Sequence, residues 1–139
     1  MADSKTVSIP LDCNQNLDDF VSDQHDTTFA YTEAVESRIY LSVGTRPDIS
    51  YAVGVVSRYL ERPSAADVKA VKRILRYIKG TVKASILYKA SQNFVFVGYS
   101  HVDYAGDSET RRSTSGYVYL LGFGVISWAS TRQKSVSTL

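Results

Sequence analysis

Apolar side chains recur every three or four residues in three stretches of the first half of the chain, which is the spacing of an amphipathic helix. The stretches cover residues 29–43, 45–62 and 64–80. In the second stretch, Thr45 is a candidate N-cap, and Pro47 falls in the first turn, where a missing N–H costs nothing. We therefore expect three consecutive helices.

The third stretch has the clearest pattern. Ser64 followed by Asp67 is typical of a capping box, and Gly80 is a typical C-terminal stop. The apolar positions of this stretch are Val68, Val71, Ile74, Leu75 and Ile78. Another side carries a stripe of cations, here called the basic face, made of Lys69, Lys72, Arg73, Arg76 and Lys79. One side of the helix is thus expected to pack while the other carries charge.

After residue 80 the pattern changes to that of β-strands. Runs rich in aromatic and β-branched residues cover residues 85–89, 94–99, 116–121 and 125–128. The Leu-Gly-Phe-Gly sequence between the last two runs predicts a tight hairpin, and a polar connection precedes them, so the last three runs form an antiparallel meander. Helices first and strands afterwards predict an α+β fold with an antiparallel sheet of three to four strands.

Polar residues without periodicity fill positions 1–28, which predicts a loop or a disordered arm. We therefore divide the chain into this leader, a helical segment over residues 29–83 and a strand segment over residues 84–139. The net charge of +2 is too small to indicate a partner, so a basic surface must come from local clustering. The single cysteine, Cys13, excludes an internal disulfide and a cysteine-based zinc site.

Neither a targeting signal nor an apolar stretch long enough to span a bilayer is visible in the sequence. We therefore expect no membrane partner and a cytoplasmic or nuclear location.

Several short motifs occur in a fixed order along the chain. They are Gly-Thr-Arg-Pro-Asp-Ile at 44–49, Ala-Val-Lys-Arg-Ile-Leu-Arg-Tyr at 70–77, Lys-Gly-Thr at 79–81, Gly-Tyr-Ser at 98–100 and Arg-Ser-Thr-Ser-Gly-Tyr at 112–117. In this order they resemble the Pol polyprotein of Ty1/copia-type LTR retrotransposons, from the end of the reverse transcriptase into the first part of the ribonuclease H domain. The resemblance covers nearly the whole chain.

The resemblance implies a thumb-like three-helix segment followed by a partial ribonuclease H-like sheet. Against the family's pattern we expect a truncated version, without the polymerase palm and without the helix that bears the second catalytic carboxylate. In the family, an aspartate follows Gly-Tyr-Ser and is the first ribonuclease H carboxylate; here His101 occupies that position. Asp103 is retained two residues further, and such residues share one face of a strand.

Ribonuclease H chemistry requires two divalent cations held by several carboxylates. The sequence offers Asp103, with Asp107 and Glu109 in the adjoining loop, and a histidine is a poor substitute for a bridging carboxylate on magnesium. We interpret Asp103 as a vestigial catalytic residue and expect no metal site and no cofactor. Magnesium would be required only by a residual metal-dependent ribonuclease H, which we keep as a third hypothesis.

The leading hypothesis is a catalytically incomplete fragment that binds nucleic acid. In the family the basic face corresponds to the thumb, whose helices lie against the template–primer duplex, so its five cations would contact the backbone of a DNA or RNA–DNA duplex without reading sequence. The other interpretation is that these side chains only solvate an amphipathic helix. Arg111 and Arg112 allow the same two interpretations, as phosphate contacts or as a basic turn between strands.

The strand runs are apolar at consecutive positions, so both faces of the sheet require burial. The helices can supply this burial by folding back over the sheet, or two copies of the chain can pair, or a partner protein can bind. The rival hypothesis is a domesticated interaction module, which binds a protein through the uncovered sheet or a helical face. The aromatic residues of the strands are expected to pack in the sheet rather than to stack on bases. They are Tyr99, Tyr117, Tyr119 and Trp128.

Overall fold

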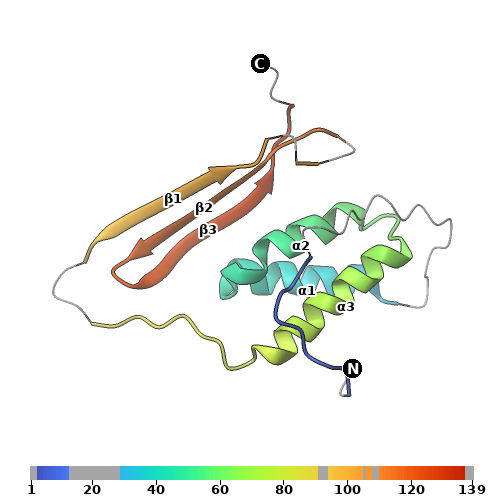
Figure 1. The fold of residues 1–139 in the computed structure, drawn as a ribbon, viewed down its shortest axis with the longest axis horizontal. Helices are drawn as coiled ribbons and strands as arrows, with labels where there is room; N and C mark the ends of the chain where they lie inside the picture. Colours follow the sequence, from blue (N-terminus) through green and yellow to red (C-terminus); the bar gives the residue numbers. More distant parts are fainter. Residues whose placement is uncertain (1–2, 13–28, 91–93, 105, 108–109, 137–139) are drawn as a thin grey trace. The chain divides into compact units, whose positions relative to one another are not determined.

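The computed structural model describes residues 3–12, 29–90, 94–104, 106–107 and 110–136 (Figure 1). The chain divides into two compact units, Met1–Ala84 and Ser85–Leu139. The candidate residues Cys13 and Glu109, and the leader from residue 13 to residue 28, lie outside the described residues.

The first unit contains the three predicted helices, α1 (Tyr31–Gly44), α2 (Ser50–Val56) and α3 (Ala65–Gly80). Short 3₁₀ turns flank α2, η2 (Pro47–Ile49) before it and η3 (Ser57–Tyr59) after it. The three helices pack against one another (Figure 1). No helix in the described part of the chain is long and apolar enough to cross a membrane.

The predicted N-cap at Thr45 is wrong. Helix α1 continues to Gly44, and the backbone N–H of Thr45 donates to the carbonyl of Leu41, so Thr45 closes α1 instead of starting the next helix. The following 3₁₀ turn begins at Pro47, and its N-cap position is Arg46, which makes no side-chain capping bond. Proline at the start of this turn agrees with the sequence prediction, since its missing N–H would have no partner there.

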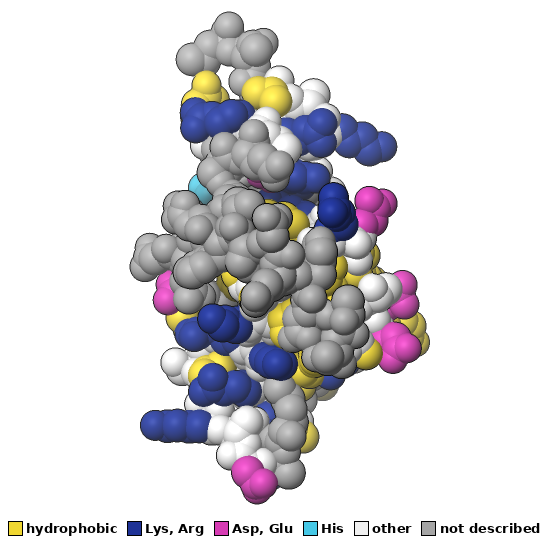
Figure 2. Space-filling model, turned by 90° about the vertical axis from the view of Figure 1, so that its right-hand side faces the viewer, with side chains coloured by type: hydrophobic (Ala, Val, Ile, Leu, Met, Phe, Trp, Pro, Cys, Tyr) yellow, Lys and Arg dark blue, Asp and Glu magenta, His cyan; other side chains and the backbone are white. Residues whose placement is uncertain are grey.

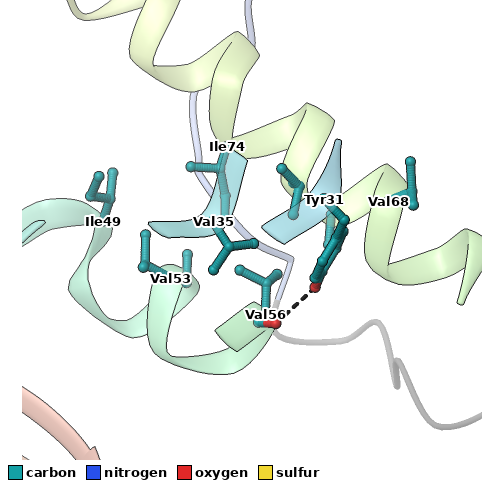
Figure 3. Packing of buried hydrophobic residues seen from close by; sticks show 10 residues of the cluster. Tyr31, Val35, Ile49, Val53, Val56, Val68 and Ile74 are labelled. Atoms are coloured by element: carbon teal, nitrogen blue, oxygen red, sulfur yellow. Dashed lines mark hydrogen bonds between the residues drawn. The ribbon is translucent and has the colours of Figure 1, made fainter. Parts of the chain in front are cut away.

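The core of the first unit lies where the three helices meet. Val35 of α1, Val53 and Val56 of α2, and Val71 and Ile74 of α3 are almost completely buried (Figure 3). Tyr31 is buried with them, and its hydroxyl donates to the carbonyl of Val56 at 2.7 Å. This hydrogen bond offsets the cost of burying the hydroxyl group, while burial raises the pKa of Tyr31 above its ordinary value.

The predicted capping box of α3 is confirmed. The Ser64 N–H donates to Asp67 Oδ2 at 2.7 Å, and the Asp67 N–H donates to Ser64 Oγ at 3.2 Å. Gly80 is the last helical residue, and a Cβ added to it would lie 3.1 Å from Cβ of Thr6. Gly80 therefore both ends the helix and allows the N-terminal segment to approach it closely.

The second unit is an antiparallel sheet of three strands in the order β1 (Phe96–Val102), β2 (Thr114–Leu121) and β3 (Gly124–Arg132). The predicted α+β class is thereby confirmed. Gly122, at a φ of 61°, occupies the first central position of the β2–β3 turn, where glycine is favoured. The hairpin therefore forms where the Leu-Gly-Phe-Gly sequence predicted it.

A fourth strand over residues 85–89 is not formed, so this part of the prediction is wrong. The segment instead contacts β3 through a side chain, because the Tyr88 hydroxyl donates to the carbonyl of Val125 at 2.6 Å. The Tyr88 ring covers Gly124 so closely that a Cβ there would collide with it.

One face of the sheet carries Phe96, Tyr117, Tyr119 and Leu121. The rings of Phe96 and Tyr119 are stacked with centroids 5.5 Å apart. Tyr119 crosses over Gly98, its partner on β1, where a side chain would collide with the ring. Phe96 and Tyr119 remain 62% and 37% exposed, and no hydrophobic side chain in the described part of this unit is fully buried. Tyr117 and Tyr119 pack in the sheet as predicted, with ring centroids 5.2 Å apart. Tyr99 remains 64% exposed, so the prediction is wrong for this residue.

Candidate nucleic-acid interface

Helix α3 separates its apolar and charged side chains as the sequence predicted. Val68, Val71 and Ile74 are buried in the core. On the basic face Lys69, Lys72 and Lys79 are exposed, while Arg73 and Arg76 are half-buried. The structure thus presents all five predicted cations along one helix, from its first turns to its last.

Most of this positive charge is not neutralised within the described part of the chain. Lys69, Lys72, Arg73 and Arg76 form no ion pair with a described carboxylate. Lys72 Nζ lies 5.3 Å from the centroid of the Phe29 ring, a cation–π contact that keeps the charge at the surface. Within the described ranges, these four cations are therefore not compensated by a carboxylate.

The N-terminal segment, residues 3–12, lies along the last turns of α3. Arg76 Nε donates to the carbonyl of Lys5, and Lys79 Nζ donates to the carbonyl of Ser4 at 2.9 Å. The carbonyl of Lys5 is a neutral acceptor, so this contact orients Arg76 without neutralising its charge. On the face drawn in Figure 2, Lys and Arg side chains lie towards the lower end and also at the upper end.

Sequence reasoning missed this contribution of the N-terminal segment. Lys5 is exposed, and it lies next to Arg76 in space although 71 residues separate them along the chain. The polar composition of the segment predicted only a loop. No periodicity or motif links the segment to α3, so only the folded structure could reveal the contact.

The Arg-Pro-Asp motif has a structural role. The buried Arg46 donates to Asp48 with Nε and Nη2, and Nη2 also donates to Thr81 Oγ1 at 2.6 Å. The Tyr77 hydroxyl donates to the same carboxylate at 2.8 Å. The hydrogen bonds from Arg46 hold the pKa of the Asp48 carboxyl below its ordinary value. The motif thereby links the turn before α2 to the end of α3.

Arg111 and Arg112 lie in the connection between β1 and β2, in the second unit. Arg111 is exposed and has a positive φ of 55°, which is unusual for a residue other than glycine. Its N–H donates to the carbonyl of Asp107, and the carboxylate of Asp107 pairs with Arg132 at 2.8 Å. The loop is therefore shaped by Asp107, and the role of the two arginines in phosphate binding stays a prediction.

Asp103 uses its carboxylate for the fold of the hairpin. Its Oδ1 accepts a hydrogen bond from the N–H of Thr114, and its own N–H donates to the carbonyl of Thr114 at 3.1 Å. It lies one residue beyond β1, whereas His101 is an exposed residue within β1. Among the described residues, no group of three or more His, Cys, Asp or Glu side chains converges as metal ligands would. These residues do not fit a pair of magnesium ions.

The comparisons with known proteins point to transposons. The chain is 46% identical to the retrovirus-related Pol polyprotein from transposon TNT 1-94 of Nicotiana tabacum over 107 residues. These aligned residues make up 77% of this chain and 8% of that polyprotein. It is 38% identical to the retrovirus-related Pol polyprotein from transposon RE1 of Arabidopsis thaliana over 136 residues. This alignment covers 98% of this chain and 9% of that polyprotein.

A shorter relative is matched over most of its length. A protein named secreted RxLR effector protein 161, from Plasmopara viticola, is 43% identical over 107 residues, which cover 77% of this chain and 75% of that protein. No family model matches the chain, and no solved structure gives a significant match.

Proposed function

Because this chain belongs to the family of retrovirus-related Pol polyproteins from transposons, we propose that its basic face binds the phosphate backbone of nucleic acid duplexes without reading their sequence. We further propose that it corresponds to the end of the reverse transcriptase and the first part of ribonuclease H in a copia-type polyprotein. The ordered motifs from residue 44 to residue 117 support this assignment. The chain spans only 8% and 9% of the two polyproteins, so their other activities are not carried over.

A single observation carries the binding proposal: the first four cations of the basic face have no carboxylate partner in the described part of the chain. A helix that only needs solubility usually intersperses acidic residues among its lysines. Here the only acidic residue of α3, Asp67, is buried in the capping box. An uncompensated row of cations favours a polyanionic partner.

The dimensions of the row suit a phosphate backbone. From Lys69 to Lys79 the helix rises about 15 Å, at about 1.5 Å for each residue. Successive phosphates of one DNA strand advance by about 3.4 Å along the duplex axis. The basic face therefore spans roughly four phosphates, and its lysines and arginines would release counterions there without contacting base edges.

Fluorescence anisotropy tests this proposal with a labelled DNA duplex, an RNA–DNA hybrid and a single strand at several salt concentrations. We expect binding that weakens as salt rises and that is independent of sequence. Replacing both Lys69 and Lys72 by glutamine should lower the affinity about sixtyfold at 0.1 M salt and reduce the slope of log K against log salt by about two.

The matched control is the double variant Arg62→Gln with Lys134→Gln, which removes the same charge from exposed positions outside α3. A wild-type chain that does not bind at low salt would refute the proposal. Equal losses in the two double variants would also refute it, because binding would then depend on net charge rather than on the basic face.

The sheet favours a second candidate function, the association of two copies of this chain. Strands β1 and β3 are both edges, and β3 carries no charge before Arg132, although exposed edge strands usually carry charges that prevent pairing. Sedimentation of wild type, Phe96→Lys on the edge strand β1 and the equally charged control Tyr104→Lys tests this function. A dimer that is lost only in Phe96→Lys supports it, and a monomeric wild type refutes it.

A further inference from the structure

We infer that the N-terminal segment, residues 3–12, forms part of the phosphate-binding surface. In this inference, Lys5 is a sixth phosphate-binding cation, and the carbonyls of Ser4 and Lys5 are positioning groups for Lys79 and Arg76. The inference deepens the proposed function and depends on it, because it extends the same surface by a segment distant in sequence.

Two hydrogen bonds place the N-terminal segment beside the basic face. Arg76 Nε donates to the carbonyl of Lys5, and Lys79 Nζ donates to the carbonyl of Ser4. Because Lys5 itself supplies the acceptor for Arg76, its backbone lies directly beside the basic face. Its side chain is exposed, and it forms no ion pair within the described part of the chain.

The segment is fixed at further points along its length. Thr6 packs against Gly80, where even a methyl group would crowd it at 3.1 Å. Leu11 packs against the hydrophobic core of the first unit. Contacts on both sides of Lys5 and further along the segment therefore hold the backbone in place, so its carbonyls can serve as fixed acceptors.

The contact with the carbonyl of Lys5 prepares Arg76 for a phosphate instead of blocking it. The carbonyl occupies only Nε of Arg76, which leaves the donors of both terminal guanidinium nitrogens for a phosphate. A neutral acceptor leaves the positive charge of the guanidinium unchanged. Because the hydrogen bond already restricts the rotamers of the Arg76 side chain, less conformational entropy is lost when a phosphate binds. The segment also adds the charge of Lys5 next to this side chain.

The test compares duplex binding by wild type, Lys5→Gln and Arg62→Gln at salt concentrations between about 0.05 and 0.2 M. Lys5→Gln keeps the backbone carbonyl and removes only the charge. If Lys5 contacts a phosphate, the slope of log K against log salt falls by about one, and affinity at 0.1 M salt falls about eightfold. Arg62→Gln, an equal loss of charge at an exposed position outside α3, should leave the slope unchanged.

A second variant, Leu11→Ala, tests the positioning role without changing charge. Removing the side chain that anchors the segment should weaken binding several-fold, and circular dichroism at 222 nm shows whether the helices remain folded. A gain in affinity for Leu11→Ala, or an unchanged slope for Lys5→Gln, overturns the inference. If the Lys69/Lys72 variant loses affinity while Lys5→Gln does not, the proposed function stands and only this extension fails.

Discussion

Arg46 and Asp48 form a two-point ion pair, from Nε to Oδ1 at 2.9 Å and from Nη2 to Oδ2 at 2.7 Å. Arg46 is only 8% exposed, so its charge depends on this carboxylate and on Thr81 for partners. The arrangement explains why an arginine and an aspartate follow one another so closely at the start of a mostly apolar helical stretch. The pair connects two distant parts of the first unit.

The first prediction concerns the loss of this pair. Asp48→Asn leaves the buried Arg46 charge without its counterion and should lower the free energy of unfolding by about 1–2 kcal/mol. Adding Arg46→Met to this variant should recover part of the loss, because it removes the uncompensated charge. Urea titration followed by circular dichroism at 222 nm measures the change, since every described helix belongs to the first unit.

The control for this prediction is Glu61→Gln, which makes the same change of carboxyl to amide at an exposed position. It should leave the midpoint of unfolding unchanged within the experimental error. Equal effects of Asp48→Asn and Glu61→Gln would contradict the structural role of the ion pair.

The second prediction is a dependence of stability on acid pH. Hydrogen bonds from Arg46 and Tyr77 hold the pKa of Asp48 below its ordinary value of 3.8. A lowered folded pKa means that the stabilisation is complete above the unfolded pKa and is lost as the pH falls through the folded pKa. Because Asp48 is about one-third exposed, the stabilisation is about 1 kcal/mol after solvent screening.

Melting temperatures between about pH 2 and pH 6 measure this effect in the wild type and in Asp48→Asn. The difference between the two proteins should be constant near neutral pH and should shrink below about pH 4. A difference that is the same at both ends of the range would show that another group causes the acid sensitivity.

The sequence revealed those features whose partners lie close together along the chain. The capping box joins Ser64 to Asp67 within one turn, and the hairpin at Gly122 depends on its own backbone conformation. The cluster around Asp48 joins it to Tyr77, 29 residues away. Its motif was visible in the sequence, but its structural role was not, because no local pattern records such a contact.

The same reason explains the errors in the strand region. The content of aromatic and β-branched residues predicts a strand over residues 85–89, yet a strand requires a neighbouring edge with free backbone groups. The segment contacts the sheet through Tyr88 instead. Residue type predicts that Tyr99 packs in the sheet, but its exposure depends on the side chains around it, which the strand pattern does not specify.

The third prediction concerns the start of α3. Ser64→Ala removes the side chain that accepts from the Asp67 N–H, and it should destabilise the first unit by about 1 kcal/mol. Ser64→Thr keeps the hydroxyl group and should retain most of the stability. Urea titration at 222 nm measures both variants, and a Ser64→Ala protein as stable as wild type would contradict the importance of the capping box.

The fourth prediction separates the structural role of Asp103 from a catalytic one. Its carboxylate oxygen accepts from the Thr114 N–H at the entry to β2. Asparagine retains a side-chain oxygen that can accept this bond, so Asp103→Asn should change the stability of the sheet little. Asp103→Ala leaves that N–H without its acceptor and should cost about 1 kcal/mol. The fluorescence of Trp128, the only tryptophan, follows the second unit.

The catalytic role is tested on the same proteins by incubation with an RNA–DNA hybrid and magnesium or manganese. We expect no cleavage by the wild type, because the described residues around Asp103 do not supply the several carboxylates that two cations require. Cleavage that disappears in Asp103→Asn would show that Asp103 is a catalytic residue and would refute this prediction. Cleavage that persists in that variant would refute it as well and would point to carboxylates elsewhere in the chain. A stability change confined to Asp103→Ala, without cleavage by any of the three proteins, is the result that the hydrogen bond to Thr114 predicts.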